Sequence, residues 1–454
     1  MPLLKDLQSL LSPGQVTFNE TMREHHSHDE SYHEPHLPDV VAFPESVADV
    51  AAILKYAGKN RVPVVPFALG TSLEGHAIPV HGGISLDMMR MNRVLEIRPD
   101  DFLACVQPGV TKRQLNDALR RHGLFFPVDP GSDPSLGGMV STNASGTTTV
   151  RYGAMRDQVR ALEVVLPDGS IIRTGSLAAK SSSGYHLTGL FVGSEGTLGV
   201  FTELWLRVYG LPEAVIAARA SFPDVDRCVR AATAIMGAGI PVARVEFIDA
   251  YMIHAVNRFQ GASYPEAPTL FLEFHGNPAG VRQEIDSVQE LTNSEGCLAF
   301  DFAESEEARR ELWDARHVAA TAFLANCPGK RNMSTDVCLP LSELPGAIAH
   351  ANQALADSGL QGGIVGHVGD GNYHVLLAVD PADPADLETA YATNDLIVGY
   401  ALERGGTCTG EHGVGVGKQR FQAREHGASL DLMRAMKRMI DPEHIMNPGK
   451  LVDE

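Results

Sequence analysis

The chain has 454 residues, of which 44% are hydrophobic and 20% charged, a composition that is typical of globular proteins and excludes disordered and collagen-like chains. Its 37 Lys and Arg and 56 Asp and Glu give a formal charge of −19, which argues against nucleic acid binding because acidic surfaces repel phosphate backbones. No stretch approaches the roughly 18 uninterrupted apolar residues of a membrane helix, so no transmembrane segment is predicted. The first residues, MPLLKDLQSLLSPGQ, have neither a secretory nor a mitochondrial targeting pattern. We therefore expect a cytoplasmic location, with peripheral attachment to the inner face of a membrane left open.

Residues 1–36 form a polar segment whose second half is crowded with histidine. A metal site is one interpretation, but nothing in the segment fixes the imidazoles in one geometry, so a solvated leader that crosses the surface is the simpler hypothesis. The six cysteines are scattered without C-x-x-C spacing, which fits neither an iron–sulfur cluster nor a zinc ribbon. We expect them to be reduced and mostly buried.

Residues 37–210 alternate short strand and helix patterns, which indicates a first α+β domain. Strands are predicted in VVAF, VPVVPF, GGISLDM and LACVQPGV. One helix is expected after Ser46, and another, TKRQLNDALRRHG, is capped by Thr111 and ends at its glycine. The string VRALEVVLPDGSIIRTG is typical of a hairpin that turns at Asp168-Gly169.

The pattern changes at Leu211-Pro212, and residues 211–410 are predicted to form a second α+β domain with an antiparallel sheet and helices on one face. Its strand and helix patterns begin with AVIAARASF, VDRCVRAATAIMGAG, VARVEFID, TLFLEFHG and VRQEIDSVQELTNSEG. Residues 411–454 are expected to return to the first domain, with a helix that stops before Pro442.

The common nucleotide and hydrolase motifs are absent, since the chain has no G-x-G-x-x-G, P-loop, G-x-S-x-G or H-E-x-x-H. Two glycine-rich segments, PFALGTSLEGH (66–76) and DPGSDPSLGGMVSTNASGTTTVRYG (129–153), could still hold a diphosphate. Glycine lets the backbone approach an anion closely, and the hydroxyl groups add donors. Composition alone does not separate this hypothesis from ordinary long loops.

The order of several motifs is more specific than any one of them. PFALGTSLEG, LACVQPGV, PGSDPSLGGMVSTNASGTTTVRYGAMRDQV, LPDG and FVGSEGTLGVFTELWL together resemble the FAD domain of the vanillyl-alcohol oxidase and p-cresol methylhydroxylase superfamily. HVGDGNYH, GEHGVGVGKQR and DPEHIMNPGKL resemble the D-lactate dehydrogenase (cytochrome) and glycolate oxidase flavoprotein family. The resemblance covers nearly the whole chain after residue 36.

This resemblance implies an α+β fold, in which a two-part FAD-binding domain of the p-cresol methylhydroxylase type is followed by a substrate, or cap, domain. It also implies noncovalent FAD, with His76 the nearby candidate for a covalent link. Ala68 or Leu69 stands where relatives often have Gly, and the small methyl group of Ala68 should preserve the loop. The residues expected at the flavin are Pro66, Gly70, Thr71, Ser72, Leu73, Gly75, Pro130, Gly131, Ser132, Gly137, Gly138, Ser141, Asn143, Ser145, Gly146, Tyr152, Gly153, Gly193, Glu195, Gly196, Gly199, Val200 and Asn447.

The string IVGHVGDGNYHVLLAV (364–379) predicts a hairpin, because Asp370-Gly371 is a strong type I′ turn signal between β-rich flanks. With a two-residue loop, His367 would lie directly opposite His374, with Cβ atoms about 5 Å apart. Two imidazoles so placed suit a divalent metal, although a chance pair on a sheet surface is equally compatible.

Glu411 and His412 are neighbours in the glycine-rich string GGTCTGEHGVGVG, where adjacent side chains of an extended backbone point in opposite directions. A plain surface loop is the alternative. By resemblance, Glu411 is the third ligand of a divalent metal (Zn, Mn or Fe) beside His367 and His374, and His412 is the general base. Such a ligand set leaves positions open for substrate oxygens, as a catalytic metal requires.

Arg316 lies on a predicted helix in ELWDARHVAATAF, where its guanidinium could form a surface ion pair or grip a carboxylate with two hydrogen bonds. By resemblance, the Arg of this W-x-x-R pattern binds the substrate carboxylate. Relatives that act on hydroxyglutarate have a Thr and a Lys at places that look like Ala320 and Ser334 here, which favours the D-lactate type. The nearby Lys330 and Arg331 leave a second carboxylate contact open.

These features predict an FAD-dependent D-2-hydroxy-acid dehydrogenase, with D-lactate the leading substrate and glycolate or D-2-hydroxyglutarate the alternatives. Without cluster-type cysteines, electrons must leave to an external acceptor, such as a quinone, a cytochrome or an electron-transfer flavoprotein. A flavin-free metal-dependent hydrolase would leave the glycine loops without a role. A nonenzymatic flavin-binding subunit would leave the metal residues unexplained. Assembly as a homodimer is left open.

Overall fold

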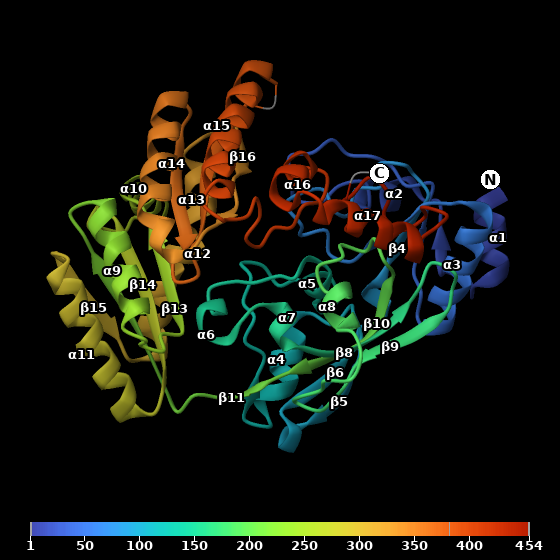
Figure 1. The fold of residues 1–454 in the computed structure, drawn as a ribbon, viewed down its shortest axis with the longest axis horizontal. Coiled ribbons are helices and arrows are strands. Elements are labelled where there is room, and N and C mark those ends of the chain that lie inside the picture. Colours follow the sequence, from blue (N-terminus) through green and yellow to red (C-terminus); the bar gives the residue numbers. More distant parts are fainter. Residues whose placement is uncertain (1, 381, 453–454) are drawn as a thin grey trace. The chain divides into compact units, whose positions relative to one another are not determined.

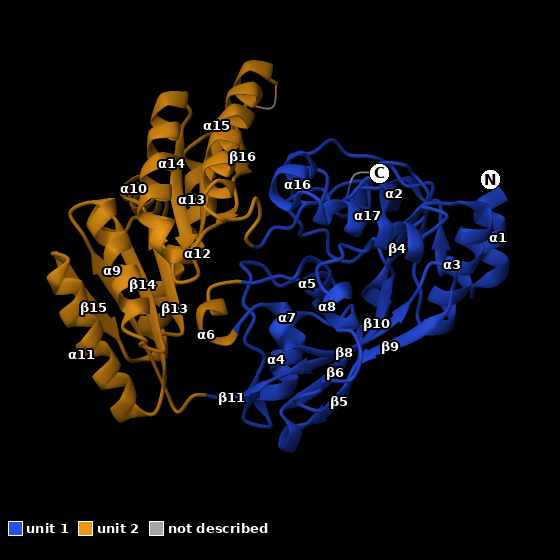
Figure 2. Ribbon diagram, in the orientation of Figure 1, with its two compact units in different colours: residues 1–145, 153–211, 411–454 blue, residues 146–152, 212–410 orange. Residues whose placement is uncertain are grey.

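The computed structural model describes residues 2–380 and 382–452, and the chain divides into two compact units (Figures 1 and 2). Unit 1 contains residues 1–145, 153–211 and 411–454. Unit 2 contains residues 146–152 and 212–410. The chain therefore enters unit 2 twice, first for a short stretch inside the second glycine-rich segment.

The first sheet of unit 1 has the strand order β1-β2-β4-β3, and its last three strands are parallel. Buried Ile53 and Leu54 of the helix that follows β2 pack against these strands in one core. Ser46 caps that helix as predicted, and Asp49 completes the capping box. The elements are α1 (Pro2–Leu10), β1 (Val16–Thr17), α2 (Glu20–His25), β2 (Val40–Ala42), α3 (Val47–Asn60), β3 (Val64–Phe67) and β4 (Ile84–Asp87).

The N-terminal segment is part of this unit, and the prediction of a solvated leader is wrong. Leu7 of α1 and His26 are fully buried, and β1 pairs with β2. Nε2 of His26 lies 3.0 Å from Oδ2 of Asp87. The prediction failed because the segment's partners lie farther along the chain, where neither periodicity nor local composition shows them.

The second sheet of unit 1 is antiparallel and has the strand order β5-β6-β10-β8-β9. Its strands are β5 (Val94–Arg98), β6 (Leu103–Val106), β8 (Val159–Val165), β9 (Ile171–Gly175) and β10 (Val200–Arg207). The predicted hairpin at Asp168-Gly169 joins β8 to β9. Thr111 caps α4 (Lys112–Arg120), as predicted, and Leu115 and Leu119 of this helix are buried in the core of the sheet.

Further helices and short strands complete unit 1, and α5 lies inside its second glycine-rich segment. They are η1 (Met88–Arg90), η2 (Pro99–Asp101), β7 (Leu124–Phe125), α5 (Leu136–Thr142), α7 (Met155–Gln158), α8 (Leu187–Phe191), β11 (Tyr209–Gly210), α16 (Gln419–His426) and α17 (Ser429–Ile440). Helix α17 ends before Pro442, as predicted. Beyond it, Met446 bridges to Val64 of β3, so the end of the chain packs on the first sheet.

Unit 2 is built on an antiparallel sheet with the strand order β15-β12-β14-β13-β18-β19-β16, and β17 also pairs with β19. The strands are β12 (Ala214–Ser221), β13 (Arg244–Ile248), β14 (Thr269–Gly276), β15 (Ala299–Ala303), β16 (Arg331–Ser334), β17 (Val337–Cys338), β18 (Gly362–His367) and β19 (Asn372–Val379). The predicted antiparallel sheet is confirmed.

The helices of unit 2 cover both faces of this sheet, whereas the sequence predicted one face. Trp313 and Phe323 share a core with Phe271 of β14, while its neighbours Leu270 and Leu272, which point the other way, are also fully buried. Helices α9 and α11 contact the same strand. The helical elements are α6 (Thr149–Tyr152), α9 (Val225–Gly237), α10 (Ala250–Gln260), α11 (Pro278–Ser294), α12 (Glu306–His317), α13 (Ala319–Ala325), η3 (Leu341–Glu343), α14 (Leu344–Ser358) and α15 (Pro384–Leu402).

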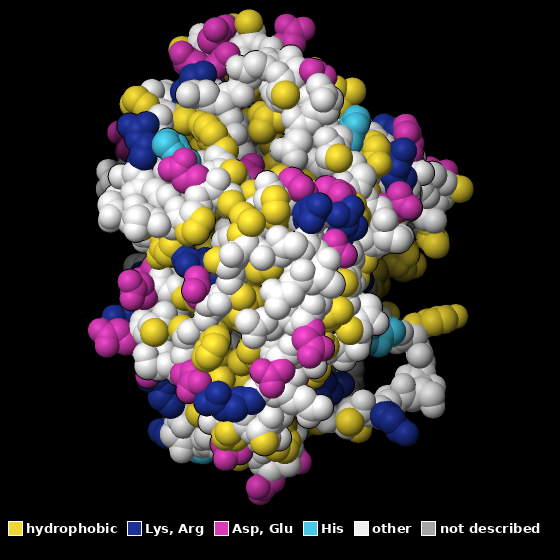
Figure 3. Space-filling model, turned by 90° about the vertical axis from the view of Figure 1, so that its left-hand side faces the viewer, with side chains coloured by type: hydrophobic (Ala, Val, Ile, Leu, Met, Phe, Trp, Pro, Cys, Tyr) yellow, Lys and Arg dark blue, Asp and Glu magenta, His cyan; other side chains and the backbone are white. Residues whose placement is uncertain are grey.

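The surface, the cysteines and the helices of the described structure can be compared with what the composition predicted. On the face drawn in Figure 3, acidic and basic side chains are interspersed with apolar ones. All six cysteines are free and four of them are buried, as predicted. No helix in the described part of the chain combines the length and apolar character that crossing a bilayer requires.

Candidate active site

Two neighbouring strands of unit 2, β18 and β19, carry the predicted histidine pair. Residues 368–371 connect these strands. The register pairs His367 with Asn372 and Val365 with His374. The predicted two-residue turn, with His367 directly opposite His374, is therefore wrong.

The register differs because neighbouring segments of unit 2 hold the connection. Nδ2 of Asn372 donates to Oδ1 of Asp336 and to the carbonyl oxygen of Val337, both at 2.8 Å, and the Leu339 N–H donates to the Gly371 carbonyl at 3.0 Å. Local turn preference contains no information about these contacts. Because the two histidines are diagonal neighbours in this register, they still share one face of the sheet, with ring centroids 5.6 Å apart.

Each imidazole of this pair is oriented through its Nδ1 atom. Nδ1 of His367 lies 2.7 Å from Oε1 of Glu246, and Nδ1 of His374 lies 3.1 Å from the carbonyl oxygen of Thr335. A carboxylate and a carbonyl only accept, so in the neutral rings both Nδ1 atoms carry the proton and both Nε2 atoms keep a lone pair. Metal-binding histidines have this arrangement. The two rings offer ligand nitrogens within 4.8 Å of each other.

Arg316 extends from α12 to the same buried carboxylate. Its Nε and Nη2 atoms lie 2.9 and 2.8 Å from Oε2 of Glu246. Glu246 is on β13 and is fully buried, and the side chain of Arg316 is 13% exposed. The predicted carboxylate-binding arginine and the predicted metal ligand His367 are therefore joined by one glutamate.

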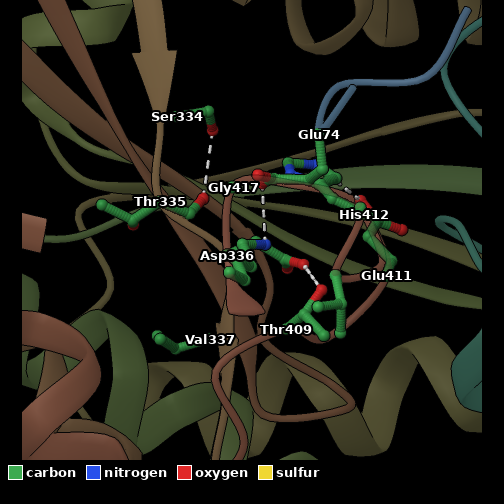
Figure 4. Close-up of polar contacts among 12 residues, drawn as sticks. Glu74, Ser334, Thr335, Asp336, Val337, Thr409, Glu411, His412 and Gly417 are labelled. Carbon is green, nitrogen blue, oxygen red and sulfur yellow. Dashed lines mark hydrogen bonds and ion pairs between the residues drawn. The ribbon is translucent and has the colours of Figure 1, made fainter. Parts of the chain in front are cut away.

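Asp336 is the centre of a second polar cluster in unit 2 (Figure 4). Its Oδ2 atom accepts a hydrogen bond from the Thr409 hydroxyl at 2.7 Å, and its Oδ1 atom lies 3.6 Å from Nδ1 of His374. A Cβ atom at Gly410 would lie 2.1 Å from Nδ2 of Asn372, so only glycine fits there. These contacts hold the backbone up to the residue that precedes Glu411.

Glu411 and His412 begin the last segment of unit 1. Oε2 of Glu411 accepts a hydrogen bond from Oγ of Ser145 at 3.0 Å, and Oε1 lies 3.9 Å from Nε2 of His412. The two side chains are 15% and 11% exposed. Because His367 and His374 belong to unit 2, the set of three metal ligands stays a prediction.

Two carboxylates of unit 1 hold the segment that follows the Glu-His pair: Glu74 of the first glycine-rich segment and Glu195. Glu195 accepts the N–H groups of Val414 and Gly415 at 2.7 and 2.9 Å. Nζ of Lys418 lies 2.9 Å from Oε1 of Glu74. Burial alone would raise the pKa of Glu74, but the charge of Lys418 and the hydrogen bonds from His33 and Lys418, with the charge of His412, together lower it.

His76 forms a buried pair with Glu195 in unit 1, with Nε2 3.3 Å from Oε2. Burial alone would lower the pKa of His76, but the charge and hydrogen bond of Glu195, with the charges of Asp29 and Glu74, together raise that pKa above 6.5. Burial alone would raise the pKa of Glu195, but the charge of His76 and the two backbone hydrogen bonds lower it. Both side chains are therefore stabilised in their charged forms.

Several of the predicted flavin residues meet in unit 1. The Glu195 N–H donates to the Ser141 carbonyl at 2.8 Å, and Nδ2 of Asn447 donates to the carbonyl oxygens of Glu195 and His76 at 2.7 and 3.1 Å. A Cβ atom at Gly196 would lie 3.0 Å from the ring of Pro66. Segments far apart in the sequence therefore converge here.

Several buried polar atoms at this convergence have no hydrogen-bond partner among the described residues. They include Nδ1 of His76, Oγ of Ser194 and Oδ1 of Asn447. Buried polar atoms in folded proteins are normally hydrogen bonded, so each such atom calls for a partner. A ligand with many donors and acceptors fits this requirement, and FAD, with its diphosphate and its ring nitrogens and oxygens, is such a ligand.

The other predicted flavin residues are distributed over both units. Gly146 and Tyr152 belong to unit 2, where the Tyr152 hydroxyl lies 2.9 Å from Nδ1 of His275. Ser72 donates to Asp29 at 2.7 Å. The flavin-binding roles of all the predicted residues stay predictions, those above as well as Gly70, Thr71, Leu73, Gly75, Pro130, Gly131, Ser132, Gly137, Gly138, Asn143, Ser145, Gly153, Gly193, Gly199 and Val200.

Sequence reasoning missed Glu246 and Asp336. A signal for both was available, because each is an acidic residue within a short apolar strand pattern, VARVEFID and STDVCLP. A carboxylate at a buried strand position needs a charged or hydrogen-bonding partner. The pattern would have shown that partners exist, but not which residues they are.

Comparison with known families gives two matches. The FAD linked oxidases, C-terminal domain, match residues 211–451, and the FAD binding domain matches residues 38–175. The chain is 44% identical over 455 residues to the probable D-lactate dehydrogenase, mitochondrial, of Danio rerio, covering 99% of this chain and 92% of that protein. It is 42% identical over 452 residues to the D-lactate dehydrogenase (cytochrome), mitochondrial, of Arabidopsis thaliana, covering 99% and 80%.

A more distant relative is the glycolate oxidase subunit GlcD of Bacillus subtilis, 34% identical over 420 residues, covering 91% of this chain and 89% of that protein. Among solved structures, p-cresol methylhydroxylase with substrate bound has a TM-score of 0.81 at 20% identity and covers 99% of this chain and 96% of that one. At this identity the likeness concerns the fold alone. It confirms the predicted fold class.

Proposed function

The chain belongs to the FAD linked oxidase family, and we propose that it oxidises D-lactate to pyruvate with FAD and passes the electrons to an external acceptor. The observation that supports this most is the arrangement in unit 2, where Arg316 and His367, one member of the histidine pair, are joined through Glu246. A 2-hydroxy acid has a carboxylate that Arg316 can bind and an adjacent hydroxyl group that can lie toward His367 and His374. Residues 37–210 with 411–454 would bind FAD, and residues 211–410 would bind the substrate.

Arg316 is the proposed anchor of the substrate carboxylate. Its guanidinium has five N–H donors, and its contacts with Glu246 use the Nε and Nη2 atoms. The Nη1 edge can therefore point at a substrate while the other edge is fixed. An arginine held in this way loses little conformational freedom when it binds a carboxylate.

The proposed metal ligands are the Nε2 atoms of His367 and His374 with the carboxylate of Glu411. Support comes from the Nδ1 contacts of both imidazoles and from the fixed backbone that leads to Glu411. Two imidazoles and one carboxylate suit Zn, Mn or Fe. A divalent ion, when bound there, would lower the pKa of the substrate hydroxyl.

His412 is the proposed general base, the role that the family resemblance gives it. The expected extended backbone is not found at this place, since residues 411 and 412 form a bend and Nε2 of His412 lies 3.9 Å from Oε1 of Glu411. His412 would take the proton of the C2 hydroxyl while the C2 hydrogen leaves with its electron pair, which gives the 2-oxo acid. The hydride acceptor is supplied by FAD when it is bound. The buried pair of His76 and Glu195 keeps the loop after His412 in place.

The alternatives are less well supported. Lys330, which could have bound a second carboxylate, lies 3.0 Å from Asp386, so its charge is already paired. This contact favours a monocarboxylate over D-2-hydroxyglutarate. The flavin-free hydrolase is not favoured, because the chain matches the FAD binding domain.

Location, acceptor and assembly are separate questions. The expected cytoplasmic location stays a prediction, since the D-lactate dehydrogenases of Danio rerio and Arabidopsis thaliana are named as mitochondrial. The Arabidopsis relative is named after a cytochrome, which makes a cytochrome the first acceptor to test beside quinones and electron-transfer flavoproteins. The homodimer also stays a prediction.

Anaerobic reduction of the flavin tests the proposed function directly. Purified protein should be yellow, acid precipitation should release free FAD, and D-lactate should bleach the flavin absorbance. L-lactate, glycolate and D-2-hydroxyglutarate are the controls and should act more slowly. A colourless protein that gains no flavin on incubation with FAD, or equal bleaching by L-lactate, would contradict the proposal.

A further inference from the structure

We propose that Glu246 is a positioning residue that sets the tautomer of His367 for metal binding and, with its other oxygen, fixes the guanidinium of Arg316. The inference rests on the proposed function, because it concerns the same metal and substrate. Oε1 faces Nδ1 of His367 at 2.7 Å, and Oε2 faces Nε and Nη2 of Arg316 at 2.9 and 2.8 Å. Each oxygen thus serves one functional side chain.

The full burial of Glu246 makes this arrangement consequential. Its side chain has no exposure to water, so its hydrogen bonds are made to protein groups. The positive charge of Arg316 compensates the negative charge of the carboxylate. The carboxylate then accepts a hydrogen bond from Nδ1 of the imidazole, and the lone pair of Nε2 remains for a metal. A carboxylate behind a metal-binding histidine fixes the ring and raises its basicity.

Replacement by glutamine separates the two roles. The amide has one acceptor oxygen and one donor nitrogen. Its oxygen should face Arg316, because hydrogen bonds from a charged donor are about twice as strong as neutral ones. The NH2 group then faces His367, whose Nδ1 must accept instead of donate. The ring proton moves to Nε2, and the lone pair that would bind the metal is lost.

Glu246→Gln should therefore weaken metal binding more than substrate binding. Loss of a partner behind a metal-binding histidine typically costs about 10- to 100-fold in metal affinity. We expect the Kd for Mn²⁺, measured on the FAD-loaded protein by electron paramagnetic resonance, to rise within this range. At saturating Mn²⁺, the KM for D-lactate should change little, because Arg316 keeps an acceptor for both of its donors.

The chain offers a matched control in Glu273 of β14. This carboxylate is also buried, lies 3.3 Å from Nε of Arg244 and 2.7 Å from Nε2 of His275, and contacts neither Arg316 nor His367 in the described structure. Glu273→Gln disturbs a glutamate between an arginine and a histidine in the same sheet. Its Kd for Mn²⁺ should equal that of the parent protein.

If both variants bind Mn²⁺ like the parent, or both weaken it equally, the inference is wrong. A parent protein that reduces its flavin with D-lactate but binds no metal would also overturn the inference, while a parent that is not reduced by D-lactate refutes the proposed function first. If Glu246→Gln does not fold, the ¹⁵N chemical shifts of the histidines in the metal-free parent protein show the tautomer of His367 instead. The signal lost in His367→Asn must be that of a ring protonated at Nδ1, and a ring protonated at Nε2 would refute the inference.

Discussion

Replacing Glu195 by glutamine should destabilise unit 1 and displace the loop that carries His412. Glu195 is 5% exposed, accepts the N–H groups of Val414 and Gly415, and lies 3.3 Å from Nε2 of His76. Its backbone has a φ of 52°, in the left-handed region, so the surrounding loop must hold this residue in place. Glutamine has nearly the same shape, but it offers one acceptor oxygen instead of two.

The expected loss follows from the contacts that glutamine cannot make. One of the two backbone N–H groups loses its acceptor and faces an amide NH2, and an unsatisfied buried donor costs about 1–3 kcal/mol. The charged partner of His76 is also removed, and breaking a buried ion pair costs about 3–5 kcal/mol when the remaining charge cannot be neutralised. His76 can lose its proton in the variant, which reduces the cost of removing its charged partner. The combined loss in the free energy of unfolding should therefore be about 3–5 kcal/mol.

The difference between the two proteins should depend on pH. The pKa of His76 is raised by Glu195 above 6.5, so its contribution is fully present below about pH 6.5 and is lost as pH rises through the folded-state pKa. The pKa of Glu195 is lowered below 4.5, so its contribution is present above that value and is lost as pH falls through the folded-state pKa. The variant should differ most from the parent between these two limits.

Urea unfolding of the FAD-saturated proteins at about pH 5.5 and about pH 9 measures this difference. Glu203→Gln is the control, because that side chain is 23% exposed and its ion pair with Arg173 has a separation of 4.0 Å. Exposed pairs contribute about 0–1 kcal/mol. If Glu195→Gln is no less stable than Glu203→Gln at the lower pH, or if its deficit grows at the higher pH, the buried pair does not act as argued.

Local structure was predictable where neighbouring residues determine it. Ser46 and Thr111 cap their helices as predicted, because an N-cap depends on a side chain and a backbone group three residues apart. The hairpin at Asp168-Gly169 and the helix end before Pro442 also depend on a few adjacent residues. The motif order identified the family, since it spans both matched domains.

The histidine hairpin shows where local reasoning ends. Asp370-Gly371 is a strong turn signal, yet the register is set by Asn372, whose amide bonds to Asp336 and Val337. The pairing error was two residues, and because side chains alternate with period 2, both histidines kept their common face. The predicted proximity of the two histidines therefore survived an incorrect register, whereas an error of one residue would have separated the pair.

The carboxylates behind the functional residues were the least predictable part of the site. Glu246 is separated by 121 residues from His367 and by 70 residues from Arg316. Glu195 is separated by 219 residues from Val414. Sequence patterns indicate that a buried strand position is unusual for an acid, but the partner depends on the order of strands in the sheet. These contacts therefore had to come from the structure.

Further predictions concern the cap of α10 and the roles of the residues at the start of the last segment. Asp249→Ala removes the N-cap of α10 and the acceptor of the Ile364 N–H, which should cost about 0.5–2 kcal/mol for the cap and about 1–3 kcal/mol for the unpaired donor, whereas Asp249→Asn should cost less in urea unfolding. His412→Ala should keep metal and FAD but reduce its flavin about 10²- to 10⁴-fold more slowly in anaerobic stopped-flow measurements with D-lactate. Glu411→Ala should release the metal and keep FAD, because the flavin loops are held by other contacts. Elemental analysis and flavin absorbance of the two variants separate ligand from base. If His412→Ala loses the metal while Glu411→Ala retains it, the two roles are exchanged, and if His412→Ala is reduced at the parent rate, His412 is not the base.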